Sequence, residues 1–230
     1  MYDYRSFRLS KLNRPEFEHV KLLLFWPFFG LAFLVLERLL KLDFHPISCV
    51  LDNIIPFNEY FIIPYYFWFV FIIGMLVYSF LFDIPTFRRY MKYIIITYTF
   101  TLLIYVIYPT KQDLRPPVFE RNNVFTRIVG FLYGFDTNTN VCPSLHVIGS
   151  MAVYFAARKS KLFGKFLWRI AFLFMTIMIC ISTVFLKQHS IIDIAAGVLV
   201  SLAAYPLVYN KKGLEEKQLS DESEKLNQYA

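Results

Sequence analysis

The feature that most constrains the fold of this chain is the stretch from Phe61 to Phe82, which contains no charged side chain. A helix needs about 20 apolar residues to cross the hydrocarbon core of a bilayer. Five further stretches reach this length or approach it: 20–40, 90–108, 144–157, 166–186 and 190–209. The sequence therefore predicts an all-α polytopic membrane protein with six transmembrane helices and the lipid bilayer as its surroundings.

The composition agrees with a membrane protein and excludes other classes. The 230 residues are 57% hydrophobic and 18% charged, whereas soluble domains are about half apolar and about a quarter charged. A water-soluble enzyme, a disordered chain and a disulfide scaffold are therefore excluded. The net charge of +7 does not indicate nucleic-acid binding, because the basic residues form short clusters between the apolar stretches and no continuous face.

The basic clusters predict the orientation of the six spans. With an even number of spans, both termini lie on one side, and that side would carry 17 of the 24 Lys and Arg residues. Basic residues are enriched in cytoplasmic segments, so we expect residues 1–20 and the polar segment 211–230 to be cytoplasmic tails. Residues 21–210 form the membrane domain, with segments 41–60, 109–143 and 187–189 facing outward. We expect the plasma (cytoplasmic) membrane, with the active site on its outer side.

The fourth predicted span is shorter than the hydrocarbon core that it would have to cross. Residues 144–157 would form a helix of about 21 Å, against a hydrocarbon core of about 30 Å. Either the helix continues through Arg158 and Lys159, whose long side chains reach the interface, or its outer end lies below the surface. The second case creates a recess with a helix N-terminus at its floor.

Polar residues at membrane depth are costly and indicate function, and here they concentrate at the outward ends of the spans. They lie in the segments 111–117, 142–146 and 182–193. His189 and Asp193 are four residues apart, so on one helical face the carboxylate can hydrogen-bond the imidazole. That bond leaves the other ring nitrogen as a nucleophile and stabilises the cation formed on attack.

The other polar residues complete a site for a phosphoryl group. His146 lies in the first turn of its helix, where unpaired backbone N–H groups and the helix dipole favour an anion. Lys111, Arg115 and Lys187 add positive charge, and Arg115 offers a bidentate fork. One histidine would attack phosphorus while the other protonates the leaving oxygen.

These motifs resemble those of the type 2 phosphatidic acid phosphatase family, over about residues 90–209. The family pattern is K-x6-R-P, P-S-G-H and S-R-x5-H-x3-D, and this chain has Arg115-Pro116, Pro143-Ser144-Leu145-His146 and Ser182-Thr183-x5-His189-x3-Asp193. The resemblance implies that His189 forms a phosphohistidine, Asp193 orients it and His146 is the general acid. It also places Arg115, Ser144 and Leu145 against the phosphate, and it implies that no metal or other cofactor is needed.

The chain departs from the family pattern at three positions. Tyr108 stands where the lysine of the first motif is expected, and Lys111 is one candidate for supplying that charge. Leu145 replaces the glycine of the second motif, as in the P-S-x-H branch that resembles inositolphosphotransferases. Thr183 replaces the arginine of the third motif, and Lys187 is the candidate for restoring that charge.

The sequence leaves several functions open. The first hypothesis is hydrolysis of a membrane lipid phosphate or diphosphate, with phosphatidic acid, phosphatidylglycerophosphate and a polyprenyl diphosphate as candidates and the last favoured by topology. The second is a phosphotransferase that moves a phospho-head group to an acceptor hydroxyl. The third is a transporter or scaffold with a relic site. A zinc site of Cys142, His146, His189 and Asp193 is the chemical alternative, because all four are zinc ligand types.

Overall fold

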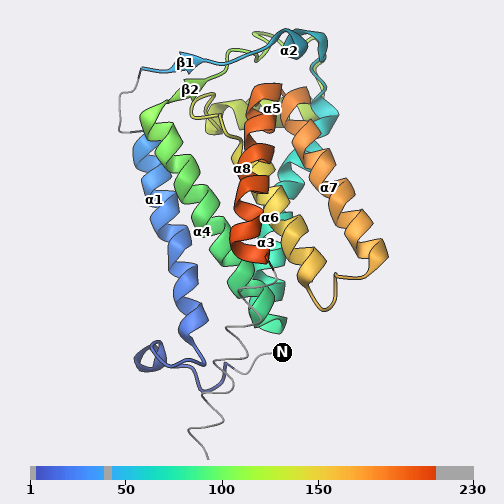
Figure 1. Cartoon of the computed structure of the whole chain (residues 1–230). Helices are drawn as coiled ribbons and strands as arrows, with labels where there is room; N and C mark the ends of the chain where they lie inside the picture. The colour runs from blue at the N-terminus through green and yellow to red at the C-terminus, as the bar shows by residue number, and fades with distance from the viewer. Residues whose placement is uncertain (1–3, 39–42, 211–230) are drawn as a thin grey trace, which may run out of the picture.

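The computed structural model describes residues 4–38 and 43–210, and a bundle of helices dominates it (Figure 1). The long helices are α1 (Phe25–Arg38), α3 (Ile62–Phe82), α4 (Ile84–Ile107), α6 (Leu145–Lys159), α7 (Phe166–Phe185) and α8 (Ile191–Tyr209). Shorter elements are α2 (Val50–Ile54), α5 (Val124–Phe135), the 3-10 helices η1 (Leu9–Lys11), η2 (Glu18–Leu24) and η3 (Glu59–Phe61), and the strands β1 (His45–Pro46) and β2 (Thr110–Lys111).

Five helical segments are long and apolar enough to cross a membrane: 18–38, 59–82, 84–107, 166–185 and 191–209. This confirms a nearly all-α protein with membrane-spanning helices. The expected third span begins earlier than the apolar run indicates, at Ile84, because the Asp83 side chain accepts a hydrogen bond from the Thr86 amide and Pro85 suits the first turn. Arg88 and Arg89 therefore lie on α4 and not in a loop.

The expected fourth span is α6, which has 15 residues and a length of about 22 Å. It continues to Lys159, as one of the two expected solutions requires, but it is still shorter than the other long helices except α1. A six-span topology with both termini cytoplasmic thus stays a prediction. The predicted tail 211–230 lies outside the described residues.

Helix α6 is short because it lies inside the bundle. It packs against α3, α4, α7 and α8, and most of its residues are buried. Two glycines permit this close packing. A Cβ at Gly149 would lie 2.6 Å from Cδ1 of Ile72, and a Cβ at Gly197 would lie 2.9 Å from Cβ of Val147. The second approach brings the start of α6 against the first turns of α8.

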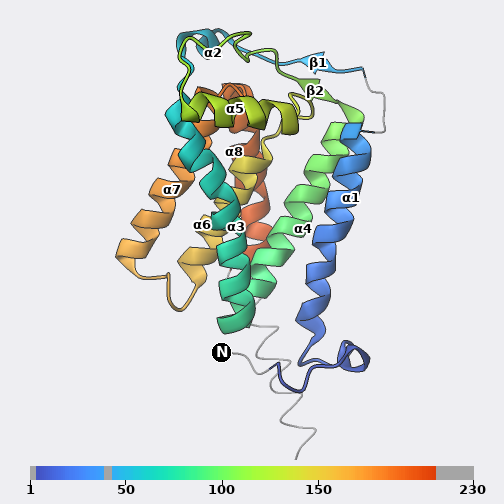
Figure 2. The same ribbon diagram turned by 180° about the vertical axis from the view of Figure 1, so that it is seen from behind.

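A cap of short elements covers one end of the bundle (Figure 2). Strands β1 and β2 pair in parallel at one side of the cap, α2 lies at the other side, and α5 runs across the ends of the long helices. The sequence did not predict α5, which lies within the expected outward loop 109–143. Its N-terminus is fixed by Asn123 and Thr126, whose side chains each bond the backbone of the other residue.

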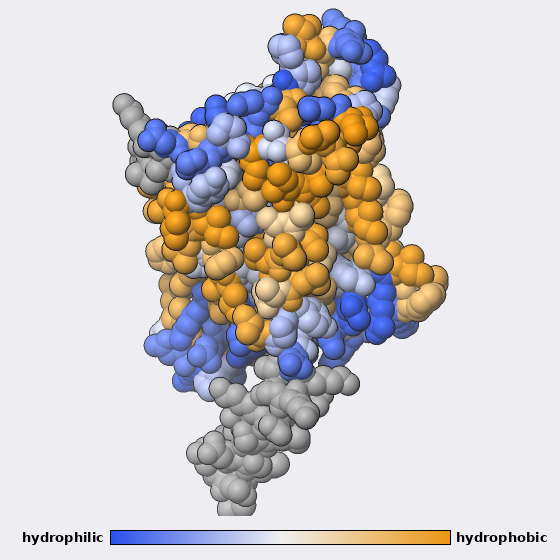
Figure 3. Space-filling view, turned by 45° about the horizontal axis from the view of Figure 1, so that its top comes forward, coloured by the Kyte–Doolittle hydropathy of each residue, from blue (hydrophilic) through white to orange (hydrophobic). Residues whose placement is uncertain are grey.

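The two ends of the described chain lie at the opposite end of the bundle from this cap. The hydroxyl of Tyr4 donates to the carbonyl of Phe80 near the end of α3, and α8 ends at Tyr209 beside Tyr93 in the first half of α4. Hydrophobic residues form a broad band around the middle of the visible surface, and hydrophilic residues gather above and below it (Figure 3). This distribution fits a helix bundle immersed in a bilayer.

Candidate active site

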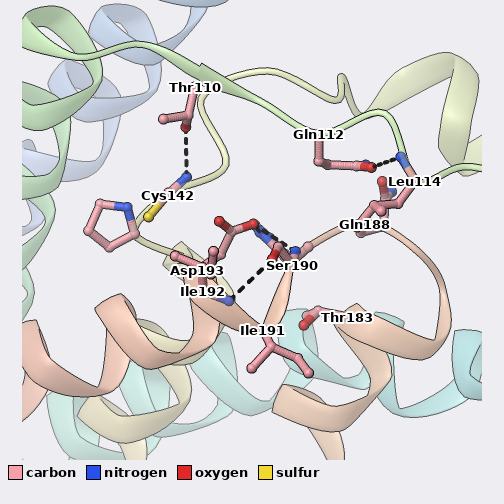
Figure 4. Close-up of polar contacts among 12 residues, drawn as sticks. Thr110, Gln112, Leu114, Cys142, Thr183, Gln188, Ser190, Ile191, Ile192 and Asp193 are labelled. Carbon is pink, nitrogen blue, oxygen red and sulfur yellow. Dashed lines mark hydrogen bonds and ion pairs between the residues drawn. The ribbon is translucent and has the colours of Figure 1, made fainter. Parts of the chain in front are cut away.

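His189, just before the Ser190 cap of α8, contacts Asp193 in the first turn of that helix. Nδ1 of His189 lies 3.2 Å from Oδ2 of Asp193, so the spacing of four residues does bring the two side chains into contact. The same oxygen accepts a hydrogen bond from the Ser190 amide, and the Ser190 hydroxyl caps the helix (Figure 4). Asp193 is fully buried and His189 is 7% exposed. Because Nδ1 is engaged, Nε2 of His189 is the ring nitrogen left to react.

Asp52 in α2 supports this turn from the cap, and the sequence did not identify it. Its Oδ2 accepts from the Ser190 hydroxyl at 2.6 Å, and its Oδ1 accepts from the Ile191 amide at 2.9 Å. The carboxylate is buried. Burial alone would raise its pKa, but hydrogen bonds from Ser190, Ile191 and Cys49 lower the pKa below its ordinary value. Asp52 is thus a second cap of α8, about 140 residues away in sequence.

His146 stands beside His189 at the start of α6. The two imidazole rings are 5.6 Å apart, centre to centre, and meet edge to face. The rings of Tyr65 and Trp68 from α3 lie 4.5 and 4.4 Å from the His146 ring. This packing fixes the position of His146, while its Nε2 is buried without a hydrogen-bond partner among the described residues.

Ser144 links the two histidine-bearing helices. Its amide donates to the carbonyl of Asp193 at 3.1 Å, and this contact needs the close approach of α8 that Gly197 allows. The Ser144 hydroxyl is buried and has no partner within the described segments. Leu145, the next residue, lines the cleft in front of His146.

Arg115 and Gln188 form a polar pair beside the histidines. The guanidinium of Arg115 donates to the side-chain oxygen of Gln188 and to the carbonyls of Tyr133, Asp136 and Thr137. Nε of Arg115 and Nε2 of Gln188 are buried donors without a partner in the described part of the chain. Gln188 lies within the third motif segment, next to His189, but its amide was not recognised as a candidate from the sequence.

The structure does not bring the other two basic candidates to the histidines. The Lys111 ammonium pairs with Asp113 at 3.2 Å on the exposed side of β2. The Lys187 ammonium donates to the backbone carbonyls of Asp52 and Ile55 at 2.6 and 2.5 Å. Lys187 thus ties α2 to the connection between α7 and α8. Thr183, at the arginine position of the third motif, is buried, and its carbonyl accepts from the amides of Gln188 and His189.

Two connected hollows meet at His146. A cleft of about 60 Å³ is lined by His146, His189 and Gln188, by Leu145 and Phe33, and by residues of the loop 136–141. A groove of about 440 Å³ continues from it between α1, α3 and α4, and its lining is almost entirely apolar and aromatic. Leu145, His146, Phe33 and Asp136 belong to both. Nowhere in residues 4–38 and 43–210 do three His, Cys, Asp or Glu side chains converge to hold a metal ion.

The chain was compared with known families once this geometry was clear. The family model of the PAP2 superfamily matches residues 31–207, which is well over half of the chain. The chain belongs to the PAP2 superfamily. No curated protein and no solved structure matches it. Members of the PAP2 superfamily are generally phosphatases or phosphotransferases, and the match covers His146, His189, Asp193 and most of the groove lining.

Proposed function

We propose that this PAP2 protein removes a phosphoryl group from a membrane lipid phosphate or diphosphate through a phosphohistidine intermediate on His189. The observation that carries the proposal is a set of buried polar atoms without partners in the described residues, on two residues that line the cleft and on two that adjoin lining residues. They are Nε of Arg115, Nε2 of Gln188, the Ser144 hydroxyl and Nε2 of His146. Buried polar atoms are nearly always hydrogen-bonded, so these donors fit a ligand that brings acceptor oxygens, as a phosphoryl group does.

The chemistry divides between the two histidines. Nε2 of His189 attacks phosphorus, and Asp193 stabilises the resulting imidazolium through its contact with Nδ1. Nε2 of His146 donates a proton to the leaving oxygen. Arg115 and Gln188 bind the non-bridging oxygens in place of the arginine that Thr183 replaces. Their pairing supports this assignment, because the Gln188 oxygen orients the guanidinium and leaves Nε2 free.

The apolar groove supports a lipid as the substrate. Its aromatic lining includes Phe29, Phe33 and Trp68, and it reaches His146, so a hydrocarbon chain lying in it would place its phosphate in the cleft. A relic site in a transporter or scaffold would not need to keep the His189–Asp193 contact and four unpartnered donors together. The P-S-L-H motif also favours the inositolphosphotransferase-like branch, in which an acceptor hydroxyl replaces water.

Trapping the covalent intermediate tests the mechanism. Brief incubation with ³²P-labelled lipid phosphate and a quench that avoids acid should leave label on the protein, in a bond stable to alkali and labile to acid. His189→Ala should abolish the label, and Asp193→Asn should slow its formation. His45→Ala is the matched control, because His45 is exposed and outside the cleft. Turnover that EDTA abolishes and zinc restores, with no trapped label, would support the zinc alternative instead.

We also propose six spans with both termini cytoplasmic and the cleft outward. The cleft is lined by the loop 136–141 and by the residues at the start of α6 and before α8, and the described chain ends lie at the end of the bundle away from the cap (Figure 1). This arrangement is consistent with the distribution of basic residues. A cysteine at Asn122, exposed in the segment before α5, should react with an impermeant maleimide in intact cells. A cysteine at Lys161, in the connection between α6 and α7, should react only after lysis. The reverse pattern would invert the topology.

A further inference from the structure

The cleft has two chemically different sides. One side contains His146 and Gln188, which have buried nitrogens without a partner in the described residues; Arg115, which bonds Gln188, and Ser144, next to Leu145, lie outside the lining itself. The other side is the loop 136–140, which contributes Asp136, Thr137, Thr139 and Asn140 to the lining and whose first two carbonyls accept hydrogen bonds from Arg115. We call this loop, together with Glu37 at the end of α1, the acceptor rim.

Glu37 determines which atoms the acceptor rim offers to a ligand. Its carboxylate accepts hydrogen bonds from the hydroxyls of Thr137 and Thr139 and from the side-chain amide of Asn140. A hydroxyl has one proton and two lone pairs, and the Thr139 hydroxyl also lies 3.0 Å from the Thr137 hydroxyl. Each threonine therefore still keeps a lone pair for another partner. Oδ1 of Asn140 is buried and without a partner among the described residues. The rim therefore presents acceptors.

Asp136 adds a carboxylate at the point where the cleft meets the apolar groove. Its Oδ2 accepts from the hydroxyl of Tyr65 at 2.6 Å, and Tyr65 is the only residue in the described chain that bonds this carboxylate. Oδ1 is thus available to a ligand. A phosphoryl group brings acceptors and negative charge, so neither Asp136 nor the rest of the rim fits it.

We propose that the acceptor rim binds a neutral polyol, one hydroxyl of which receives the phosphoryl group from His189. This inference rests on the proposed function and assigns the acceptor of the same site. A polyol brings several hydroxyl protons, which match Asp136, the threonines and Asn140. An ammonium group would also suit a carboxylate, but it has no lone pair with which to attack phosphorus. A single water has two protons and cannot engage a rim that spreads over four residues.

The transfer step needs only the phosphohistidine, the polyol and His146. The bond between phosphorus and Nε2 of His189 breaks as the bond between phosphorus and the acceptor oxygen forms. The proton of that hydroxyl moves to Nε2 of His146, which gave up its proton to the leaving group in the first step. Asp136 takes no proton, because it accepts a hydrogen bond from a second hydroxyl and so orients the first.

A comparison of two alcohols as acceptors tests the acceptor rim. The purified full-length protein is given ³²P-labelled phosphatidic acid in detergent with glycerol or with 1-propanol, which lacks two of the three hydroxyls. The measurement is the ratio of phosphorylated alcohol to free phosphate. The wild type should favour glycerol by at least about tenfold, as loss of one hydrogen bond to a charged group implies. Asp136→Asn should reduce this preference by about tenfold.

Controls separate the acceptor rim from the rest of the site. Asp113→Asn, the same change at an exposed carboxylate outside the cleft, should keep the preference for glycerol. If Asp136→Asn does not fold, Thr137→Val should lower the preference in the same direction. Equal use of the two alcohols by a wild type that releases phosphate would overturn only this inference, as would an unchanged preference in Asp136→Asn. A wild type that turns over no lipid phosphate would overturn the proposed function and the acceptor rim with it.

Discussion

Lys187 and Gln188 are consecutive residues whose side chains serve different parts of the molecule. Lys187 has a left-handed backbone, with φ of 54°, and its ammonium lies against the carbonyls of α2, where burial lowers its pKa. Gln188 is paired with Arg115 in the cleft. Charge alone would favour Lys187 as the phosphate ligand, whereas the side-chain directions favour Gln188.

Substitution of the two neighbours should separate these roles. Gln188→Leu keeps the size of the side chain but loses its free donor, so kcat/KM for a lipid phosphate should fall by roughly 10- to 100-fold. Lys187→Met keeps the aliphatic chain and leaves two carbonyls without a donor, so its main effect should be a lower Tm. Steady-state kinetics and thermal unfolding of both variants in detergent check this. A larger kinetic loss in Lys187→Met than in Gln188→Leu would return Lys187 to the phosphate.

Some of the site could be predicted from the sequence because some contacts are local. The contact between His189 and Asp193 follows from a spacing of four residues at the start of a helix. The contacts of Asp52 with Ser190 and of Glu37 with Thr137 join residues 100 or more positions apart, and no spacing rule indicates them. Asp136 follows an unpredicted helix, so its place in the cleft could not be predicted either.

At the scale of elements, the contact between α6 and α8 aligns the two histidines. Gly197→Ala would place a Cβ 2.9 Å from Cβ of Val147 and 3.1 Å from the carbonyl of Ser144. We expect a loss of about 1–3 kcal/mol in stability from overpacking and a larger loss of turnover, since α8 must move away from Ser144. Gly74→Ala in α3 is the control, because nothing lies within 4 Å of its added Cβ. Thermal unfolding and kcat of the two variants check the prediction, which equal behaviour would contradict.

The attachment of α2 to α8 predicts a dependence on pH. The pKa of Asp52 is lowered in the folded protein, so its carboxylate stabilises the fold above its unfolded pKa of about 4 and loses this effect as the pH falls through the folded pKa. Asp52→Asn cannot accept all of these bonds, and should cost on the order of 2–4 kcal/mol near neutral pH. The difference in Tm between wild type and variant should shrink below about pH 4. A difference that is constant from pH 7 to pH 3 would show that charge at Asp52 is unimportant.

At the scale of the whole molecule, the positions of the spanning helices follow from the lengths of the apolar runs. The segment 59–82 matches its expected range closely, because nothing but a membrane helix suits so long an uncharged stretch. The cap is different, since α2, α5 and the β1–β2 pair are short and held by contacts with distant segments. Their arrangement was not predictable from local pattern, yet it closes the end of the bundle over the histidines.

The groove between α1, α3 and α4 has a consequence for how the protein meets its substrate. Phe69 and Ile73 of its lining are exposed on α3, so we expect a lipid substrate to enter sideways from the hydrocarbon and not from water. The lipid would then reach the groove by diffusion within the plane of the membrane. At a fixed bulk amount of lipid phosphate, dilution with inert detergent or phospholipid should leave turnover unchanged while the groove is saturated. Below saturation it should slow turnover in proportion to the mole fraction of the lipid phosphate. Turnover that follows bulk concentration alone would mean that the lipid arrives through the cap. If entry is sideways, the rate depends on the density of phosphorylated lipid in the bilayer that surrounds the protein.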